Sequence, residues 1–179
     1  MDFEVLGYPG EDVSIDLSHE DFSYAGKFGV GDTGKSVARE DGEILGVVAF
    51  DRDRTDGDVM KIRCIEVKAG RRGEGIGSKL ARFTTSRLLG EGVDRVEIAV
   101  NNPYSFHAMY KAGFRYTGNR SGLREFVMSY PGYDTAGYGE GMQEFLEIDD
   151  ISEEERDFVE QRLEIAEMAE EFTPAMEFF

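Results

Sequence analysis

The segment that most constrains the fold is a short glycine-rich loop that joins an apolar strand to an amphipathic helix. Apolar residues alternate with polar ones over 59–67, which is typical of a strand. Over 75–90, Ile76, Leu80 and Phe83 recur at helical spacing, and glycines follow the last turn. A strand, a tight turn and a helix in this order predict a layered fold in which the helix packs on a sheet.

Further strand patterns lie on both sides of this segment. Strand-like runs occur at 3–7, 13–17, 36–40, 43–51, 96–100, 114–117 and 123–130. The Asp-Gly pair at 41–42, between two of these runs, predicts a hairpin. A second helix is expected over 103–112, because Pro103 suits a first helical turn and Gly113 follows the last one. The fold class is therefore predicted as α/β or α+β, with a mixed sheet.

The length of the chain suits one domain with an appendage. We expect a domain over 1–130 and an extension over 131–179 of different composition. The extension begins as a glycine-rich linker with Gly132, Gly137, Gly139 and Gly141. Ser152 and Glu155 then match a capping box, which predicts a last, acidic helix that runs to about Phe172.

Composition excludes several classes of protein. The longest uncharged apolar run covers 44–50, far less than the roughly 18 residues that a membrane span needs. The single cysteine, Cys64, cannot form an internal disulfide, and two histidines are too few for a zinc module. The start of the chain shows no signal-peptide pattern, so a cytoplasmic protein without a membrane partner is expected.

Charge is distributed unevenly along the chain. The net charge is −17, yet 61–133 carries 13 basic and 6 acidic residues. A basic middle favours a small, phosphate-rich ligand, whereas nucleic acid would also meet the acidic flanks. An excess of Asp and Glu with only 6 lysines resembles cytosolic proteins of salt-accumulating halophiles and suggests a halophilic archaeon as the source. The alternative is an acidic mesophilic protein with an acidic tail.

Two segments compete as phosphate-binding loops. Gly29–Ser36 matches GxxxxGK[ST], the pattern of P-loop phosphotransferases, in which a long helix follows the loop. Only 37–40 separates this segment from the Asp-Gly turn, so a chance match is favoured. The second loop opens the helix over 75–90, where backbone N–H groups, the helix dipole and basic side chains meet. Its residues are Arg71, Arg72, Gly73, Glu74, Gly75, Ile76, Gly77, Ser78 and Lys79.

The second loop and a later motif resemble those of the GNAT superfamily of N-acetyltransferases. The Arg-x-x-Gly-x-Gly run at 72–77 is similar to the acyl-CoA signature of that family. The family's second signature, an Asn before a helix that ends in Tyr-x-x-x-Gly-Phe, resembles the stretch from Asn102 through Tyr110 to Phe114. The resemblance covers about 35–130. It implies a mixed, mostly antiparallel sheet with helices on both faces, to which this chain adds its acidic C-terminal helix.

The resemblance also implies a reaction. An acetyl group would pass from acetyl-CoA to a primary amine by direct attack of the amine on the thioester, and no metal would take part. The pyrophosphate would bind the second loop, and the 3′-phosphate would bind Lys79, Arg71 or Lys111. The pantetheine would bind backbone groups where two strands splay apart, with Asn102 on one side and, on the other, Ile65, Glu66 and Val67.

Two catalytic residues follow from the same resemblance. Tyr110 matches the family's proton donor to the leaving thiolate, although it lies eight positions after the asparagine where the common pattern has seven. Glu97 matches the base of the branch that acetylates N-terminal amines of ribosomal proteins, with Glu66 and water as rivals. Strand positions 61 and 63, which often carry acids or histidines in the family, are Lys and Arg here.

Several alternatives stay open. A non-catalytic acyl-CoA-binding or interaction module would bind CoA without turnover, and a P-loop phosphotransferase would use Gly29–Ser36. The acceptor would be a small-molecule or peptide amine. His107 is expected at the surface, and Cys64 is expected in the core without a nucleophilic role. The last helix would dock on its own domain, form a homodimer with a second copy or bind another partner.

Overall fold

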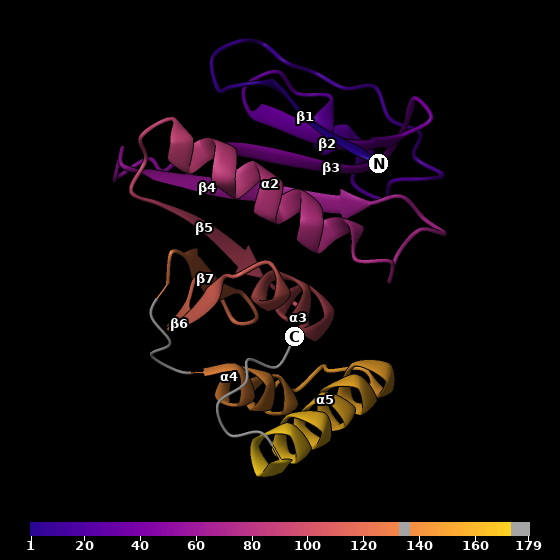
Figure 1. Ribbon diagram of the computed structural model, residues 1–179, viewed down its shortest axis with the longest axis vertical. Coiled ribbons are helices and arrows are strands. Elements are labelled where there is room, and N and C mark those ends of the chain that lie inside the picture. Colours follow the sequence, from indigo (N-terminus) through magenta and orange to yellow (C-terminus); the bar gives the residue numbers. More distant parts are fainter. Residues whose placement is uncertain (133–136, 173–179) are drawn as a thin grey trace. The chain divides into compact units, whose positions relative to one another are not determined.

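The computed structural model describes residues 1–132 and 137–172, which belong to two compact units (Figure 1). The first unit covers Met1–Ile98 and the second covers Ala99–Phe179. This division falls elsewhere than the domain boundary expected after residue 130, which stays a prediction. Each unit is built around its own layer of strands and helices.

The first unit is built on five strands, namely β1 (Asp2–Gly7), β2 (Gly34–Glu40), β3 (Glu43–Arg52), β4 (Val59–Val67) and β5 (Arg95–Val100). β1 to β4 are antiparallel neighbours in chain order, and β5 runs parallel to β4. The predicted hairpin joins β2 to β3, with Asp41 at φ 51° and Gly42 at φ 81°, the positive values that a two-residue hairpin turn needs. The mixed, mostly antiparallel sheet is thereby confirmed.

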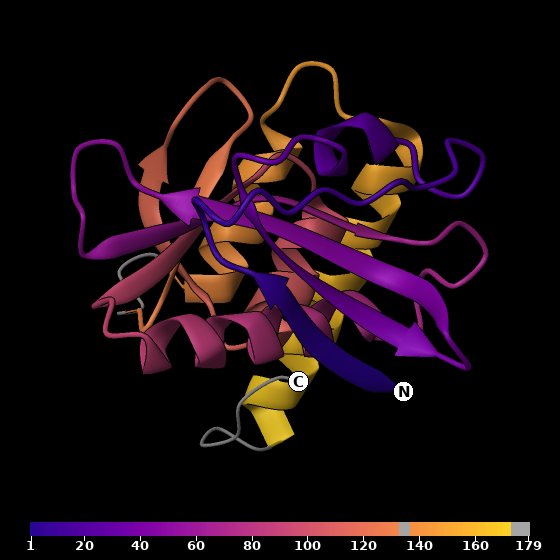
Figure 2. The same cartoon turned by 90° about the horizontal axis from the view of Figure 1, so that it is seen from above.

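Helices cover both faces of this sheet, as predicted. α2 (Ile76–Gly90) lies on one face, where Thr84 Oγ1 shares a hydrogen bond of 2.5 Å with Ser36 Oγ of β2. Gly46 of β3 makes room for the helix, because a Cβ atom there would lie 3.1 Å from Leu80. The segment 13–28, which ends in the short helix α1 (Ala25–Phe28), covers the other face. Figure 2 shows α1 and α2 on opposite sides of the strands.

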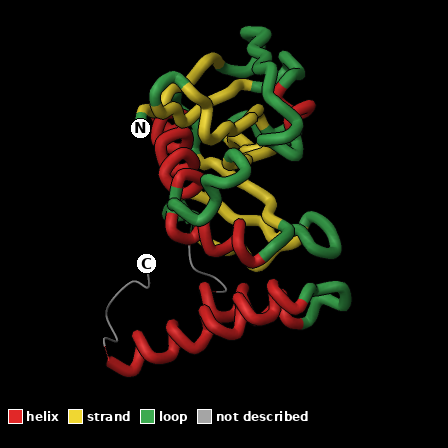
Figure 3. Tube along the Cα trace, turned by 90° about the vertical axis from the view of Figure 1, so that its right-hand side faces the viewer, coloured by secondary structure: helices red, strands yellow, loops and turns green. Residues whose placement is uncertain are grey.

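In its described part, the second unit combines a hairpin with three helices. Its elements are α3 (Pro103–Lys111), β6 (Arg115–Arg120), β7 (Phe126–Tyr130), α4 (Gly137–Leu146) and α5 (Glu153–Phe172). Phe106 of α3 is fully buried, and its ring contacts aromatic rings of β6, β7 and α4. Phe126 stacks on Phe145 at a centroid distance of 4.1 Å. α4 and α5 are neighbours (Figure 3), so the extension forms part of this aromatic core.

The last helix begins at the predicted capping box. The backbone N–H of Glu155 donates to Ser152 Oγ at 3.1 Å. Arg124, between β6 and β7, binds Glu155 at 3.1 Å and Asp150 at 3.0 Å, which ties the start of α5 to the hairpin. The first turn contains Glu153, Glu154 and Glu155, and the acidic C-terminal helix is therefore confirmed.

Two expectations about local structure are wrong. The run 13–17 is not a strand, because Ile15 is buried on the sheet face and its N–H donates to the carbonyl of Phe28 at 2.8 Å. Its alternation reflects packing on the sheet instead of strand pairing. The glycine-rich linker contains the helix α4. Gly141 serves close packing there, since a Cβ atom would lie 2.4 Å from Cζ of Phe106.

Candidate active site

The strand β4 loses its partner half way along its length. Its pairing with β5 runs from Val59 opposite Arg95 to Ile62 opposite Ile98, and β4 then continues to Val67. A register shift in the pairing with β3 falls at the same place and leaves Arg63 as the extra residue. A bulge bends and twists a strand. Backbone groups of the last β4 residues on the side away from β3 therefore lack a partner in β5 and are available to a ligand.

The loop after β4 leads to an uncapped helix N-terminus. Gly73 has φ 86° and Gly75, the N-cap of α2, has φ 79°, conformations that residues with a Cβ atom adopt only under strain. Gly75 has no side chain to cap the helix, and the Lys79 N–H already donates to the Gly75 carbonyl at 3.1 Å. The first turn contains Ile76, Gly77 and Ser78. N–H groups at a helix N-terminus, with the positive end of the helix dipole, suit a phosphate group.

The basic residues of this loop differ in their availability. Arg71 is held by Glu40 at 3.1 Å and by Glu74 at 2.8 Å. Arg72 is exposed, with Glu66 3.6 Å away as its nearest carboxylate partner. Lys79 is exposed and forms no ion pair with the residues that the structure describes. Arg72 and Lys79 can therefore turn to an anionic ligand more readily than Arg71.

Glu66 serves the fold through its side chain. It is buried, and its two carboxylate oxygens accept hydrogen bonds from the backbone N–H groups of Ser23 at 2.5 Å and Tyr24 at 3.0 Å. Tyr24 is the N-cap of α1, so Glu66 fixes the start of this helix against β4. Because both oxygens are engaged, this arrangement favours a structural role over that of a base.

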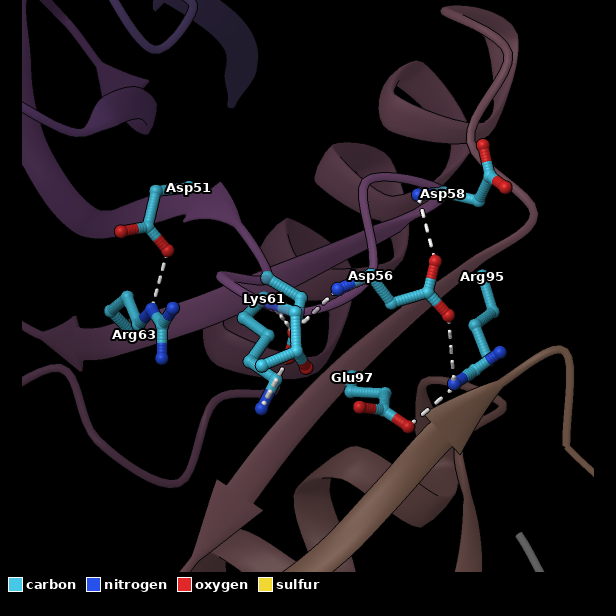
Figure 4. A network of polar contacts seen from close by, with 9 residues as sticks. Asp51, Asp56, Asp58, Lys61, Arg63, Arg95 and Glu97 are labelled. Atoms are coloured by element: carbon cyan, nitrogen blue, oxygen red, sulfur yellow. Dashed lines mark hydrogen bonds and ion pairs between the residues drawn. The ribbon is translucent and has the colours of Figure 1, made fainter.

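Glu97 lies in a network of charged residues on β3, β4 and β5 (Figure 4). It is half-buried, and its Oε2 lies 3.2 Å from Nε of Arg95, which also approaches Asp56 at 3.9 Å. Lys61 is its register partner on β4 and binds Asp53 at 2.8 Å, and this contact holds the pKa of Asp53 well below its usual value. Every basic residue of the network thus already has an acidic partner, since Arg63 binds Asp51.

The second unit carries the other predicted ligand residues. Asn102 is the N-cap of α3, and its Oδ1 accepts a hydrogen bond from the Ser105 N–H at 2.9 Å. Pro103 follows at the first helical position, as expected. Asn102 therefore has a clear structural role, and its contact with pantetheine stays a prediction. Lys111 is exposed in the last turn of α3.

Tyr110 lies inside the aromatic core of the second unit. Its side chain is 5% exposed, its ring centroid lies 5.1 Å from that of Tyr138, and the Arg115 guanidinium lies 4.3 Å above the ring. Two residues separate Tyr110 from Gly113, where the family pattern has three. Counted from either end of the motif, the position of the family tyrosine falls on Met109. Successive residues of a helix are rotated by about 100° around its axis. Tyr110 thus points to another side of α3 than the family tyrosine.

The expectation that His107 lies at the surface is wrong. It is half-buried, and its Nδ1 lies 2.9 Å from the Tyr138 hydroxyl. Burial, together with the positive charges of Arg162 and Lys111, lowers the pKa of His107 to about 4. Burial raises the pKa of Tyr138 to about 12. Both groups are therefore neutral near pH 7. Sequence reasoning missed Tyr138, because nothing local links α4 to a residue 31 positions earlier.

The P-loop alternative is wrong. Gly34, Lys35 and Ser36 lie in the strand β2 and open no helix. Lys35 is fully buried, and its Nζ donates to the carbonyls of Val13, Val30 and Thr33 at 2.6–2.9 Å. Burial lowers the pKa of Lys35. A buried lysine whose ammonium group donates to three backbone carbonyls cannot contact nucleotide phosphates.

The described ranges, 1–132 and 137–172, do not support a nucleophilic cysteine, a metal site or a membrane-spanning helix. Cys64 is half-buried against the core of the first unit, and burial raises the pKa of its thiol, as expected for a packing residue. No group of three or more His, Cys, Asp or Glu in these ranges could hold a metal ion. None of the helices there is long and apolar enough to cross a membrane.

Comparisons with known proteins agree with the fold. The sequence model of the acetyltransferase (GNAT) family matches residues 7–114. The IAA acetyltransferase from Bacillus cereus ATCC 14579 is 21% identical with a TM-score of 0.54, over 71% of this chain and 96% of that one. A Bacillus subtilis acetyltransferase, solved in complex with CoA, is 17% identical with a TM-score of 0.53, over 71% and 95%. No curated protein sequence matches significantly.

Proposed function

The chain belongs to the GNAT family of acetyltransferases, and we propose that it transfers an acetyl group from acetyl-CoA to a primary amine. One observation carries this proposal. An uncapped helix N-terminus at Gly75 directly follows a strand whose last residues lack a partner in β5. The helix N-terminus suits the pyrophosphate of CoA, and unpaired backbone groups suit the two amides of pantetheine.

In the proposed complex, first-turn N–H groups of α2 bind the pyrophosphate. Arg72 and Lys79 add positive charge there, and Arg71 adds less because Glu40 and Glu74 already hold it. The β4 backbone at 65–67 binds the pantetheine amides, which brings the thioester towards the bulge at Arg63. The basic stretch 61–133 attracts the polyanionic cofactor in spite of the acidic chain.

The reaction is a direct acyl transfer. The amine nitrogen attacks the thioester carbonyl carbon, a C–N bond forms, the C–S bond breaks, and the nitrogen gives up one proton. Glu97 is the proposed acceptor of that proton, because it lies one residue before the last paired residue of β5 and, among the described residues, has Arg95 as its single ion-pair partner. The thiolate of CoA needs no strong acid, since a thiol has an ordinary pKa of about 8.5 and water can supply the proton.

The role of Tyr110 as proton donor stays a prediction. What supports it is the resemblance of the motif that ends at Phe114. The register of α3 argues against this role, because Met109, which cannot donate a proton, occupies the position of the family tyrosine. On this account Tyr110 serves packing, and its replacement by Phe preserves most of the turnover.

A substitution at the helix N-terminus tests the binding site. In Gly75→Asp, the carboxylate would cap the first-turn N–H groups of α2 and repel a phosphate, while Asp tolerates positive φ better than most residues. Gly57→Asp is the matched control, because Gly57 is exposed and has open space around it. Calorimetry with acetyl-CoA should show binding to the wild type and the control and about a hundredfold weaker binding to Gly75→Asp.

Equal affinity of the folded Gly75→Asp variant and the control would contradict the proposed site. A non-catalytic CoA-binding module would show the same binding pattern but release no free CoA with any amine. The acceptor is proposed as a small-molecule or peptide amine. A cytoplasmic, halophilic setting is supported by the net charge of −17, and a homodimer through the C-terminal segment is supported by the exposed Ile165 of α5.

A further inference from the structure

A hollow of about 640 Å³ lies on the first unit, along the outer side of α2. Its lining includes Lys79, Arg82, Phe83 and Arg87 of α2, together with Tyr8 after β1 and Glu91 after the helix. Arg82 and Phe83 lie three and four positions after Lys79, and Arg87 lies four after Phe83, so the four residues share one side of α2. We call this feature the α2 hollow.

The three cations of the α2 hollow belong to the half of the first unit's cations that have no acidic partner among the described residues. Seven other cations of the first unit form ion pairs, namely Arg39, Lys61, Arg63, Lys68, Arg71, Arg72 and Arg95. Lys79, Arg82 and Arg87 form none with the described residues, and α2 itself contains no Asp or Glu. Three cations against one lining carboxylate, Glu91, give the hollow a net positive charge, which favours anions.

Packing holds part of this charge in place. The Arg87 guanidinium lies 5.2 Å above the ring of Phe83, whose ring in turn stacks on Phe3 at 5.6 Å. A cation that rests on a fixed ring loses less freedom when it binds a ligand. Burial and the neighbouring Glu91, whose carboxylate accepts a hydrogen bond from the Tyr8 hydroxyl, raise the pKa of Tyr8.

The α2 hollow is separate from the loop proposed for CoA. Arg87 lies twelve residues after Gly75, which corresponds to about 18 Å along the helix. A ligand held by Arg82 and Arg87 therefore cannot share the first-turn N–H groups. Lys79 lies between the two places and can serve either.

We propose that the α2 hollow binds a small organic anion that carries at least two negative charges on phosphate or carboxylate groups. The planar guanidinium group of arginine binds phosphate and carboxylate groups alike through two parallel hydrogen bonds. The concave shape and three unpaired cations fit a compact ligand better than a flat protein surface. This site goes beyond the proposed acetyl transfer and does not depend on it.

The test is a calorimetric titration of the full chain at low ionic strength, with inorganic phosphate and citrate as the two probes. Excess CoA is present, to occupy the loop if the proposed function holds. The double variant Arg82→Gln/Arg87→Gln should bind the preferred probe at least about tenfold more weakly than the wild type. Arg54→Gln is the matched control, because Arg54 is exposed and lies outside the lining of the hollow, and it should bind within about twofold of the wild type. The stronger probe identifies phosphate or carboxylate chemistry.

Three results would overturn the proposal. These are unchanged affinity of the double variant, an equal loss in Arg54→Gln, and probe binding that occurs only when two copies of the chain dimerise. Arg82 and Arg87 are exposed, so the variants should fold, and circular dichroism checks this. Ser86→Asp, which adds a negative charge on the same exposed side, provides a second variant that should also weaken binding.

Discussion

The pair formed by His107 and Tyr138 predicts a loss of stability in mild acid. His107 has a pKa lowered to about 4 in the folded chain, against an ordinary value of about 6.5. Between these values the unfolded chain takes up a proton that the folded chain refuses, so the free energy of unfolding falls as the pH falls. The full linkage is about 1.4 kcal/mol per pH unit, but His107 is half-buried and solvent screens part of it, so the expected loss is about 1–2 kcal/mol between pH 6.5 and pH 4, and it stops below pH 4.

The groups that face His107 define the experiment. Tyr138 of α4 shares its hydrogen bond, Phe158 of α5 lies against its ring, and the positive charges of Lys111 and Arg162 act on it. His107→Gln keeps a neutral polar group but removes the titration. The exposed His19 offers the control variant His19→Gln.

Urea unfolding of the three proteins at about pH 7 and about pH 4, in about 2 M KCl, measures the effect. Carboxylates titrate alike in all three proteins and cancel in the comparison. His107→Gln should lose about 1–2 kcal/mol less than the wild type between the two pH values, and His19→Gln should behave as the wild type. Equal losses in the wild type and His107→Gln would refute the reasoning.

Three further variants test other parts of the account. Lys35→Met should lower the free energy of unfolding by at least about 3 kcal/mol in urea titrations, because three buried carbonyls lose their donor, while acetyl-CoA binding stays unchanged. Gly141→Ala should cost about 1–3 kcal/mol by the same measurement, since its Cβ atom would lie 2.4 Å from a buried ring, whereas Gly139→Ala, with open space around it, should cost nothing. Tyr110→Phe should keep kcat within about threefold in a thiol-release assay, and a fall of about a hundredfold with unchanged CoA binding would restore its role as donor.

Local patterns predicted the elements that depend on neighbouring residues. The Asp-Gly turn at 41–42 formed the hairpin, because positive φ is a property of those residues themselves. Ser152 formed the capping box for the same reason. The loop before Gly75 could be recognised because glycine spacing, charge and the adjoining strand and helix lie within one stretch of chain.

Features that depend on distant residues could not be predicted. Glu66 clamps backbone groups about 40 residues earlier, and nothing near it in the sequence announces that contact. Lys35 matches a P-loop pattern, but its ammonium group donates hydrogen bonds to backbone carbonyls from three separate positions. The glycine pattern around Gly141 predicts a linker where the structure has α4, because in sequence a glycine needed for close packing looks the same as one in a loop.

The central claim is that this chain transfers acetyl groups from a CoA thioester bound at the N-terminus of α2. Release of free CoA should be followed with a thiol reagent, in the presence of acetyl-CoA and a mixture of peptide, polyamine and amino-sugar acceptors. The account predicts amine-dependent release by the wild type and Gly57→Asp, acetylated amine by mass spectrometry, and loss of both with Gly75→Asp. Full turnover by Gly75→Asp, or no turnover with any amine, would contradict it.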